Sequence, residues 1–283
     1  MPELPEVENL VLELKRVLTG LEIDRAQVRN DSILDSPCQE LQAGISGKEI
    51  IQVRRIGKYI RIQLSDCFLW FHLGMTGQLL FEDLPAQLDP HVHFILSFAG
   101  SRKRLFYRDV RRFGRIALSP SAESEWPAGV RRLGREPKEC SQEAFASLFK
   151  LSRARIKNLL LNQKVVSGLG NIYADESLHR AGIHPLRRAH ELPRRRLFRL
   201  HEAICEVLEE ATRYGGSSVD DYLHLDRTRG RFQELHRVYG RGGKNCQTCT
   251  TPIRKIKLSG RSSSFCPRCQ QYRERSQQPA RNL

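Results

Sequence analysis

The sequence predicts a multidomain α+β protein, with an N-terminal helix and a β-sandwich or barrel followed by a helical part and a metal-binding hairpin. Three observations predict this fold class. One stretch of helical periodicity opens the chain, seven short strand-like segments follow it, and further helical stretches lead to two Cys-x-x-Cys pairs. With 283 residues, the chain is long enough for more than one hydrophobic core.

The first helix is predicted from Val7 to Leu18, where apolar residues recur at helical spacing and Gly20 marks the stop. Because this helix has one apolar face for a core, its N-terminus must be held in a fixed place. In the simplest interpretation, Pro2 and Pro5 only start the helix, since prolines and acidic side chains suit a first turn.

Pro2 and Glu3 also provide the two groups that Schiff-base chemistry needs, a nucleophilic amine and an acid or base beside it. If Met1 is removed, Pro2 becomes a secondary amine, and α-amino groups ordinarily have a pKa near ~8. A fraction of that amine is neutral and nucleophilic at physiological pH, and the Glu3 carboxylate beside it can act as an acid or a base. On these residues alone, the helix-start and nucleophile interpretations both stay open.

The predicted strands are short segments divided by Gly, Pro, Asp and Ser turns, and several have alternating apolar residues. They are Ile50–Ile56, Tyr59–Leu64, Phe68–Leu73, Gln78–Phe81, His93–Phe98, Arg104–Tyr107 and Arg115–Leu118. Seven short strands at this spacing favour a β-sandwich or barrel. The pattern lacks the strand–helix alternation and the glycine loop of a dinucleotide-binding fold.

The pattern changes near residues 133–137, where Gly134 and Pro137 predict a linker. Helical stretches are predicted beyond it, at about 141–150, 153–162, 172–181, 193–213 and 218–225. An arginine-rich stretch at 187–199 is interpreted as a solvated helix face.

The charge of the chain is strongly one-sided, because 47 Lys and Arg residues face 32 Asp and Glu residues, a net charge of +15. A field of this sign favours a polyanionic partner, with nucleic acid ahead of an anionic membrane. No apolar run approaches the ~18 residues of a membrane span, and no N-terminal signal segment is recognisable. We therefore expect a cytoplasmic protein.

Cys246-x-x-Cys249 and Cys266-x-x-Cys269 flank a predicted hairpin. The four thiolates suit one tetrahedral Zn²⁺ and leave it no open position, so the zinc is expected to be structural. Disulfides are the alternative, which the cytosol disfavours. The hairpin presents Arg261 as a phosphate ligand. The remaining cysteines are interpreted as buried thiols: Cys38, Cys67, Cys140 and Cys205.

Three further residues are candidate phosphate ligands. Asn171 follows the tight turn Gly168-Leu169-Gly170, where free backbone N–H groups at a helix start bind phosphate; helix capping by its side chain is the alternative. Lys58 lies in a turn between two predicted strands. Lys157 lies in the helix before the glycine turn, and its alternative is a surface lysine without a function.

Met75, Arg111 and Phe113 occupy turns next to predicted strands. An exposed Met near an Arg and a Phe can wedge into a stack of bases. The alternative is that Met75 and Phe113 belong to the core.

Taken together, these residues resemble the formamidopyrimidine-DNA glycosylase family, also called MutM. Six motifs carry the resemblance, in the same order as in the family and over almost the whole chain. They are Pro2-Glu3-Leu4-Pro5-Glu6-Val7-Glu8, Gly57-Lys58-Tyr59, His72-Leu73-Gly74-Met75, Arg111-Arg112-Phe113-Gly114, Gly168-Leu169-Gly170-Asn171-Ile172-Tyr173 and the four cysteines. The sister endonuclease VIII group usually has Gly where Leu4 stands.

The resemblance implies how the chain is divided. An N-terminal catalytic β-sandwich domain is expected at 1–132, a linker at 133–137, a helix-two-turn-helix DNA-binding domain at 138–240, a zinc finger at 241–272 and a flexible tail at 273–283. It also implies one structural Zn²⁺ and a monomer. The implied partner is double-stranded DNA with oxidised bases or abasic sites, bound in the cleft between the domains, with no membrane involved.

The resemblance further implies a bifunctional DNA glycosylase and AP lyase of base excision repair, which removes oxidised purines such as 8-oxoguanine and formamidopyrimidines. Pro2 would attack C1′ of the damaged nucleotide, and the resulting Schiff base would lead to β- and δ-elimination. Glu3 would be the acid/base, supported by Glu6. Lys58 and Arg261 would hold phosphates and assist the elimination.

The remaining family roles concern DNA. Asn171 and Lys157 would hold phosphates, and His91 would make a further DNA contact. The void left by the flipped nucleotide would be filled by three residues: Met75, Arg111 and Phe113.

Two departures from the family pattern stand out. Val110 replaces a Pro, and near the flipped base Asp220 and Arg231 stand where many members have Lys and Tyr. The second departure leaves the lesion preference open. Two alternative functions therefore remain: an oxidised-pyrimidine glycosylase of the endonuclease VIII type, and a catalytically silent zinc-finger DNA-binding protein.

Overall fold

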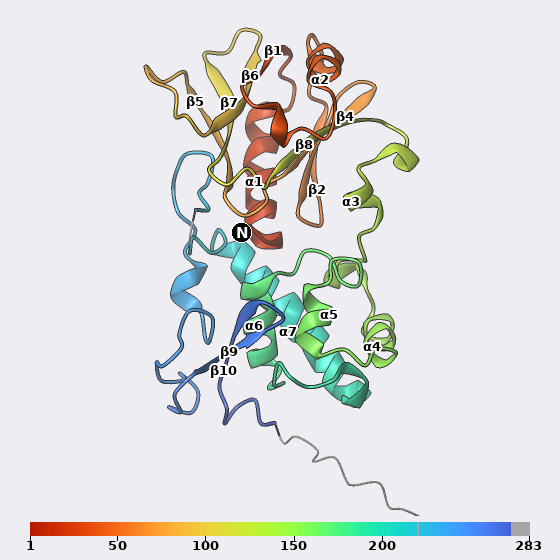
Figure 1. Cartoon of the computed structure of the whole chain (residues 1–283), viewed down its shortest axis with the longest axis vertical. Helices are drawn as coiled ribbons and strands as arrows, with labels where there is room; N and C mark the ends of the chain where they lie inside the picture. The colour runs from red at the N-terminus through yellow and green to blue at the C-terminus, as the bar shows by residue number, and fades with distance from the viewer. Residues whose placement is uncertain (220, 273–283) are drawn as a thin grey trace, which may run out of the picture. The chain divides into compact units, whose positions relative to one another are not determined.

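The computed structural model describes residues 1–219 and 221–272, which form two compact units (Figure 1). The N-terminal unit contains Met1–Glu136, Val166–Leu169 and Leu208–Leu235. The C-terminal unit contains Pro137–Val165, Gly170–Val207 and the described residues from His236 to Tyr272. Asp220 and the tail expected at 273–283 lie outside the described residues. Both units draw on separate stretches of the chain, and the domain boundaries expected from the sequence stay a prediction.

Helix α1, Leu4–Leu18, confirms the first predicted helix. It begins before the predicted Val7 because Glu3 and Glu6 form a reciprocal capping box at its start. Gly20, just beyond its end, has a φ of 85°, which favours glycine. The face that α1 buries in the core consists of Val7, Leu10, Val11, Leu14 and Leu18.

Two four-stranded antiparallel sheets form the sandwich of the N-terminal unit (Figure 1). The first has the order β2-β3-β4-β8, with strands Gln52–Ile56, Tyr59–Gln63, Cys67–His72 and Arg115–Pro120. The second has the order β1-β6-β7-β5, with strands Ile23–Val28, Val92–Phe98, Lys103–Asp109 and Gly77–Asp83. All seven predicted strands are confirmed.

Strand β1 is the one that the sequence does not predict. Its buried residues Ile23 and Ala26 are separated by exposed Asp24 and Arg25. The pairing of β1 with β6 shifts register between Ile23 and Arg25. This irregularity breaks the alternation with a period of two by which a half-buried strand is recognised.

The core of the N-terminal unit also includes the segment after α7, through Tyr222 and Leu225. The helix predicted at 218–225 is wrong, since none of the described residues there is helical. Phe81 of β5 donates its backbone N–H to the carbonyl of Leu225 (3.2 Å). The segment therefore covers the edge strand β5, and hydrogen bonds within it, such as that from the Ser218 hydroxyl to the carbonyl of Tyr222 (2.9 Å), support its non-helical course.

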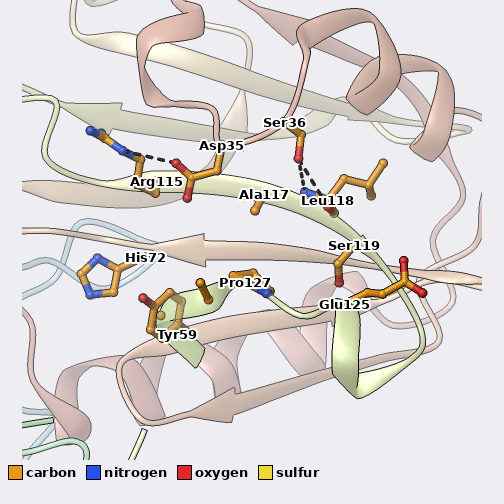
Figure 2. Close-up of a pocket in the computed structure, with 12 residues that line it drawn as sticks. Asp35, Ser36, Tyr59, His72, Arg115, Ala117, Leu118, Ser119, Glu125 and Pro127 are labelled. Atoms are coloured by element: carbon orange, nitrogen blue, oxygen red, sulfur yellow. Dashed lines mark hydrogen bonds and ion pairs between the residues drawn. The ribbon is translucent and has the colours of Figure 1, made fainter. Parts of the chain in front are cut away.

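A pocket of about 430 Å³ opens beside the sheet that contains β3, β4 and β8 (Figure 2). Tyr59 and His72 line it with their rings 4.7 Å apart, and Arg115 lies 3.5 Å from Asp35. Burial, with the positive charges of Lys58 and Arg115, lowers the pKa of His72 to about 4. His72 is therefore neutral at physiological pH, and its Nδ1 accepts the N–H of Gly74 (3.3 Å).

The helices of the C-terminal unit confirm four predicted helical stretches. They are α4 (Gln142–Lys150), α5 (Ile156–Leu161), α6 (Asn171–Arg180) and α7 (Arg194–Arg213), whose end from Leu208 belongs to the N-terminal unit. Helix α5 is shorter than predicted because the residues before it pair with another segment: Ile156 donates its N–H to the carbonyl of Arg187 (2.7 Å). Strands β9 (Arg254–Leu258) and β10 (Arg261–Phe265) form the predicted antiparallel hairpin.

The remaining elements are short. They are the helices α2 (Cys38–Ile45) and α3 (Ala128–Arg131) and the 3₁₀ turns η1 (Asp31–Ile33), η2 (Glu123–Glu125), η3 (Pro137–Glu139), η4 (Ala189–Glu191) and η5 (Phe232–Leu235). Among residues 1–219 and 221–272, no helix has the length and apolar character needed to cross a bilayer. Four of the six arginines in the arginine-rich stretch are exposed, as predicted: Arg188, Arg194, Arg195 and Arg199.

Candidate functional site

The first residues of the chain are held in place by backbone hydrogen bonds. Met1 is exposed, whereas Pro2 and Glu3 are buried. Glu3 donates its N–H to Glu6 Oε2 (2.7 Å), and Leu4 donates its N–H to the carbonyl of Gly168 (3.0 Å). The helix-start interpretation of this stretch is therefore correct, and it also fixes the position of Pro2.

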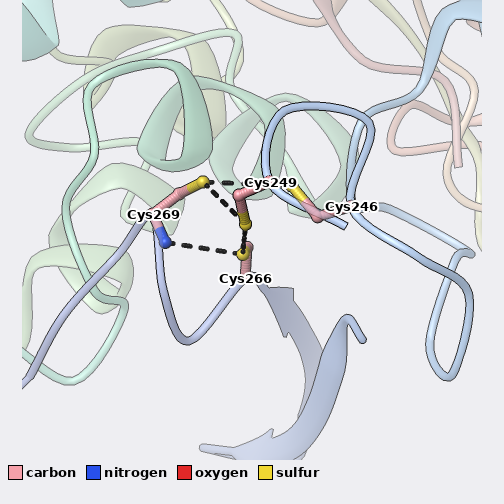
Figure 3. Close-up of side chains that lie close together, drawn as sticks. All are labelled: Cys246, Cys249, Cys266 and Cys269. Carbon is pink, nitrogen blue, oxygen red and sulfur yellow. Dashed lines mark hydrogen bonds between the residues drawn. The ribbon is translucent and has the colours of Figure 1, made fainter. Parts of the chain in front are cut away.

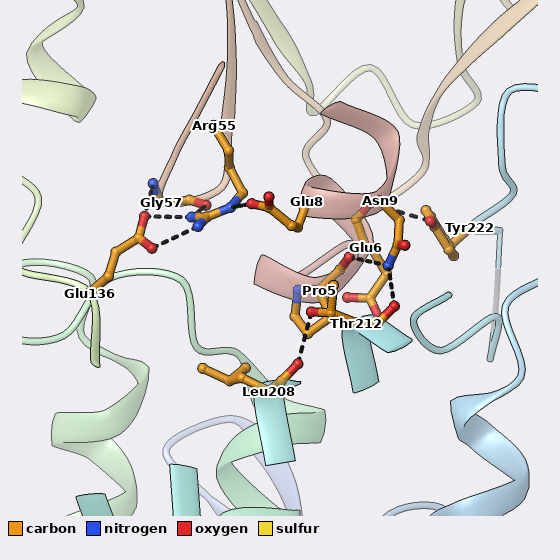
Figure 4. Close-up of polar contacts among 10 residues, drawn as sticks. All are labelled: Pro5, Glu6, Glu8, Asn9, Arg55, Gly57, Glu136, Leu208, Thr212 and Tyr222. Carbon is orange, nitrogen blue, oxygen red and sulfur yellow. Dashed lines mark hydrogen bonds and ion pairs between the residues drawn. The ribbon is translucent and has the colours of Figure 1, made fainter. Parts of the chain in front are cut away.

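Glu6 joins this start to the turn that follows α7. Its side chain is 1% exposed, and Oε1 accepts the N–H of Ser217 (2.7 Å) while Oε2 accepts that of Glu3. Tyr222 donates its hydroxyl to the carbonyl of Glu6 (3.3 Å) (Figure 4). Gly216 has a φ of 79°, and a Cβ there would lie 2.8 Å from Glu6 Oε1, so only glycine leaves room for the carboxylate.

Lys58 lies in the turn between β2 and β3, as predicted, and is 6% exposed. An ion-pair network holds the backbone of this turn at Gly57 (Figure 4). Arg55 contacts Glu8 (2.5 Å) and Glu136 (2.5 Å), and Glu136 also accepts the N–H of Gly57 (2.9 Å). The sequence does not indicate this network, because Glu136 falls in the predicted linker.

Met75, Arg111 and Phe113 come together on adjoining loops at the ends of the sandwich strands. Met75 is 40% exposed and Phe113 is 52% exposed, so the interpretation of both as core residues is wrong. The guanidinium carbon of Arg111 lies 4.6 Å from the centre of the Phe113 ring. The loops pack backbone to backbone, since a Cβ on Gly74 would lie 2.5 Å from the carbonyl carbon of Phe113.

His91 lies half-buried beside the same loops, just before β6. Its N–H donates to Asp89 Oδ1 (2.7 Å), and its carbonyl accepts the N–H of Asp109 (3.0 Å). Val110, which replaces the family Pro, is 42% exposed, consistent with a harmless change.

Lys157 differs most from its expectation, because it is 1% exposed rather than on the surface. Its ammonium lies 2.6 Å from Asp175 Oδ1 and donates to the carbonyl of Ser262 (2.9 Å). Asp175 also accepts the Ser263 hydroxyl (3.0 Å) and the N–H of Ser264 (2.8 Å). The surface-lysine interpretation is wrong, and the pair ties the β9–β10 hairpin to α5 and α6; a phosphate contact by Lys157 stays a prediction.

Asn171 is the first residue of α6 rather than its cap, a position that Gly170 takes. The capping interpretation is therefore wrong. Asn171 Oδ1 is buried and has no hydrogen-bond partner among the described residues. Arg261 begins β10 and is exposed, after Gly260 with a φ of 79°. Phosphate binding by Asn171 and Arg261 stays a prediction.

The four predicted zinc ligands converge on one point (Figure 3). The Sγ atom of Cys249 lies 3.4 Å from that of Cys266 and 3.5 Å from that of Cys269, which lies 3.9 Å from that of Cys246. Four thiolates at ~2.3 Å from one Zn²⁺ are about 3.8 Å apart, whereas a disulfide is ~2.05 Å long. The cluster therefore fits a structural zinc ion and not disulfides.

Helix α6 carries three supports of this finger that the sequence analysis missed. Besides Asp175, Glu176 accepts the N–H groups of Arg237, Val238 and Tyr239 at 2.8–3.0 Å, and His179 Nε2 lies 3.7 Å from Cys246 Sγ. The spacing of Asp175 and His179, four residues apart on one helix face, is the signal in the sequence that could have indicated them.

The segment after α7 is held to the sandwich by charged side chains. Glu13 of α1 binds His224 through one carboxylate oxygen and the N–H of Leu225 (2.9 Å) through the other. Arg227 contacts Glu82 of β5 (2.7 and 2.9 Å). The hydrogen bond that His224 makes to the Glu13 carboxylate, with the negative charge of Asp226, raises the pKa of His224 above its ordinary value of 6.5.

This raised pKa predicts a pH-dependent stability. A group whose pKa is raised on folding contributes stability that is present below its unfolded pKa and is lost as the pH rises through its folded pKa. We therefore expect the midpoint of unfolding to fall from pH 6.5 upward in the wild type, and less so in Glu13→Gln. Denaturant titrations between pH 6 and 9 measure this, and equal slopes in both proteins would contradict it.

The fold and the four-cysteine hairpin define a zinc-finger protein built on a β-sandwich with an N-terminal helix and on a helical unit. Three family models match the chain: the formamidopyrimidine-DNA glycosylase N-terminal domain at residues 1–116, the H2TH domain of the same glycosylase at 133–222, and the zinc finger found in FPG and IleRS at 243–271. The chain belongs to the formamidopyrimidine-DNA glycosylase family, and four of its cysteines form the zinc finger of that family: Cys246, Cys249, Cys266 and Cys269.

Relatives match over nearly their whole length. The formamidopyrimidine-DNA glycosylase of Solibacter usitatus is 45% identical, with 95% of this chain and 99% of the relative covered. That of Pelotomaculum thermopropionicum is 41% identical, with 96% and 100% covered. A Lactococcus lactis FPG variant in complex with DNA containing Fapy-dG is 36% identical with a TM-score of 0.90, and 96% and 100% of the two chains are covered.

Proposed function

We propose that this protein is a DNA glycosylase of base excision repair that excises formamidopyrimidines and 8-oxoguanine and then cleaves the strand as an AP lyase. The observation that carries the proposal is the fixed start of the chain. Glu6 and Gly168 hold the backbone N–H groups of Glu3 and Leu4, so the position of Pro2 is set in a chain 45% identical to a formamidopyrimidine-DNA glycosylase.

The proposed reaction begins once Met1 has been removed. The nitrogen of Pro2 forms a bond to C1′ as the glycosidic C1′–N bond breaks, and the base leaves with the electron pair and takes up the proton that the Pro2 nitrogen gives up. Glu3 protonates the ring oxygen of the sugar, which opens to a Schiff base. Loss of the acidified C2′ proton expels the 3′ phosphate, and a second elimination expels the 5′ phosphate.

The other site residues serve DNA binding in this proposal. Lys58, Asn171, Lys157 and Arg261 neutralise or bind phosphates, and His91 adds a contact. Met75, Arg111 and Phe113 occupy the space of the flipped nucleotide, offsetting part of the few kcal/mol that flipping costs. The zinc ion supports the finger and takes no part in the chemistry, because four thiolates leave it no open position.

Support for a damaged-DNA substrate comes from relatives with DNA bound. Lactococcus lactis FPG has been solved with abasic-site DNA, with a TM-score of 0.89 and 35% identity to this chain. The same enzyme has been solved with DNA containing an oxidised pyrimidine, also at 0.89 and 35%. We propose that this protein acts as a cytoplasmic monomer, in line with the bacterial origin of its relatives.

Trapping with borohydride tests the proposal. Mature protein is mixed with duplexes containing 8-oxoguanine opposite C, a formamidopyrimidine, thymine glycol or no lesion, and covalent complexes are separated by denaturing electrophoresis. We expect a trapped species of protein plus DNA with the two purine lesions. Preferential trapping with thymine glycol would favour a glycosylase of the endonuclease VIII type. If no lesion gave a trapped species, the proposal would be wrong and a catalytically silent DNA-binding protein would be favoured.

A further inference from the structure

The carboxylate of Asp109, at the end of β7, is fully buried and accepts four hydrogen bonds. Oδ1 accepts the hydroxyl of Thr76 (2.5 Å) and the N–H of Arg111 (3.2 Å). Oδ2 accepts the N–H of Gly114 (2.8 Å) and the hydroxyl of Tyr107 (3.2 Å). All four partners are donors, so both oxygens of the carboxylate have hydrogen-bond partners without a cation among the four.

These donors come from two different loops. Thr76 directly follows Met75 in the loop between β4 and β5, whereas Arg111 and Gly114 bracket Phe113 in the loop between β7 and β8. A direct bond adds to the link, since Arg111 also donates its N–H to Thr76 Oγ1 (3.1 Å). One carboxylate therefore joins the loop that carries Met75 to the loop that carries Arg111 and Phe113.

The surrounding packing leaves these loops little freedom. The hydroxyl of Tyr107 lies 2.8 Å from where a Cβ on Gly77 would stand, and a Cβ on Gly114 would overlap the same hydroxyl. Arg112, at the apex of the second loop, has a φ of 56°, a conformation that costs a residue with a side chain about 1 kcal/mol or more. The hydrogen bonds to Asp109 offset this strain on the residue that precedes Phe113.

We propose that Asp109 is a positioning residue. It fixes the positions of Met75, Arg111 and Phe113 relative to one another, so that the three side chains enter the stack of DNA bases together. The inference rests on the proposed function, in which these three side chains fill the void left by the flipped nucleotide. Asp109 does not touch DNA in this proposal; it acts through the two loops. Misplacement of reacting or inserting groups by about 1 Å typically costs up to ~100-fold in rate.

The test compares two substrates that differ in their need for void filling. In a duplex with 8-oxoguanine opposite C, the flipped base leaves a gap, whereas a single-stranded abasic site leaves none and still requires the amine of Pro2. Asp109→Asn is nearly isosteric, but its NH₂ group cannot accept two of the four hydrogen bonds. We expect this variant to lower kcat/KM on the duplex by about 10- to 100-fold and to change cleavage of the single strand less than about threefold.

A double-mutant cycle separates positioning from a general loss of structure. If Asp109 acts through Phe113, the effect of Asp109→Asn on the duplex is much smaller in a Phe113→Ala background. Thr76→Val keeps the carboxylate but removes the hydroxyl that links the two loops, so we expect it to have the same effect as Asp109→Asn. It takes the place of Asp109→Asn in the test if Asp109→Asn folds poorly. Asp66→Asn makes the same chemical change at an exposed pair with Lys48 and serves as the control.

The outcomes are distinct. Equal losses on both substrates, or an undiminished effect in the Phe113→Ala background, would overturn the role of Asp109. A wild-type protein that cleaves neither substrate would instead overturn the proposed function.

Discussion

Protein that begins at Pro2 is expected to cleave lesion-containing DNA about 1,000-fold faster or more than protein that keeps Met1. With Met1 present, the nitrogen of Pro2 is an amide, whose lone pair is delocalised and cannot attack C1′. The hydrogen bonds from Glu3 and Leu4 hold this segment in one place. A neighbouring amine therefore cannot take over the reaction by a shift of the chain.

The comparison needs processed protein and a chain with an added N-terminal residue, each verified by intact mass. Binding to duplex DNA containing a stable abasic-site analogue is the control, and we expect it to change much less than cleavage. In Pro2→Gly, a primary amine of different basicity and placement should slow base removal while binding is kept. Equal cleavage rates of processed and extended chains would show that Pro2 is not the nucleophile.

Lys157→Met is expected to lower the free energy of unfolding by about 3–5 kcal/mol, because it leaves the carboxylate of Asp175 buried without its cation. Both side chains are 1% exposed, and Asp175 would keep only the hydroxyl of Ser263 and the N–H of Ser264 as partners. Since Lys157 also binds the carbonyl of Ser262, the hairpin that carries Arg261 should loosen, and DNA binding should weaken as well.

Denaturant unfolding and zinc content measure this effect. The matched control is Lys164→Met, an exposed lysine of the same unit, which should stay within about 0.5 kcal/mol of the wild type. In the double variant Lys157→Met with Asp175→Asn no buried charge is left unpaired, and we expect part of the lost stability to return. A Lys157→Met variant as stable as the control would argue against this account of the buried pair.

Much of the fold follows from patterns that are local in the sequence. Strand β3 is recognised because its apolar residues alternate, β4 because it is a short apolar run between turns, and α1 because its buried residues recur at helical spacing. The same reasoning gave a wrong helix prediction for the segment at 218–225. Its apolar residues Tyr222 and Leu225 are three apart, as in a helix, but they enter a core that α1 and β5 provide.

In the candidate site as well, local sequence patterns predicted some residues, whereas others depend on contacts with distant segments. Their positions in turns next to predicted strands indicated Lys58, Met75, Arg111 and Phe113, although Lys58 is buried in the structure. The partner that holds the turn of Lys58 could not be predicted, because it comes from a distant part of the chain, whereas Asp109 lies only two residues from Arg111. Glu136 reaches the turn of Lys58 from the predicted linker.

The sequence by itself determined the ligands of the zinc site, because a tetrahedral thiolate site needs only two tight turns with paired cysteines. It also determined the residue types at the start of the chain, and with them the chemistry that Pro2 offers. Only the tertiary structure decided which charged residues are structural. Lys157, Asp175, Glu6 and Asp109 are of residue types that are mostly exposed in proteins, yet each is buried with partners that include residues of other segments. Burial depends on which segments meet, and a buried charge is stable only where those segments supply its partners.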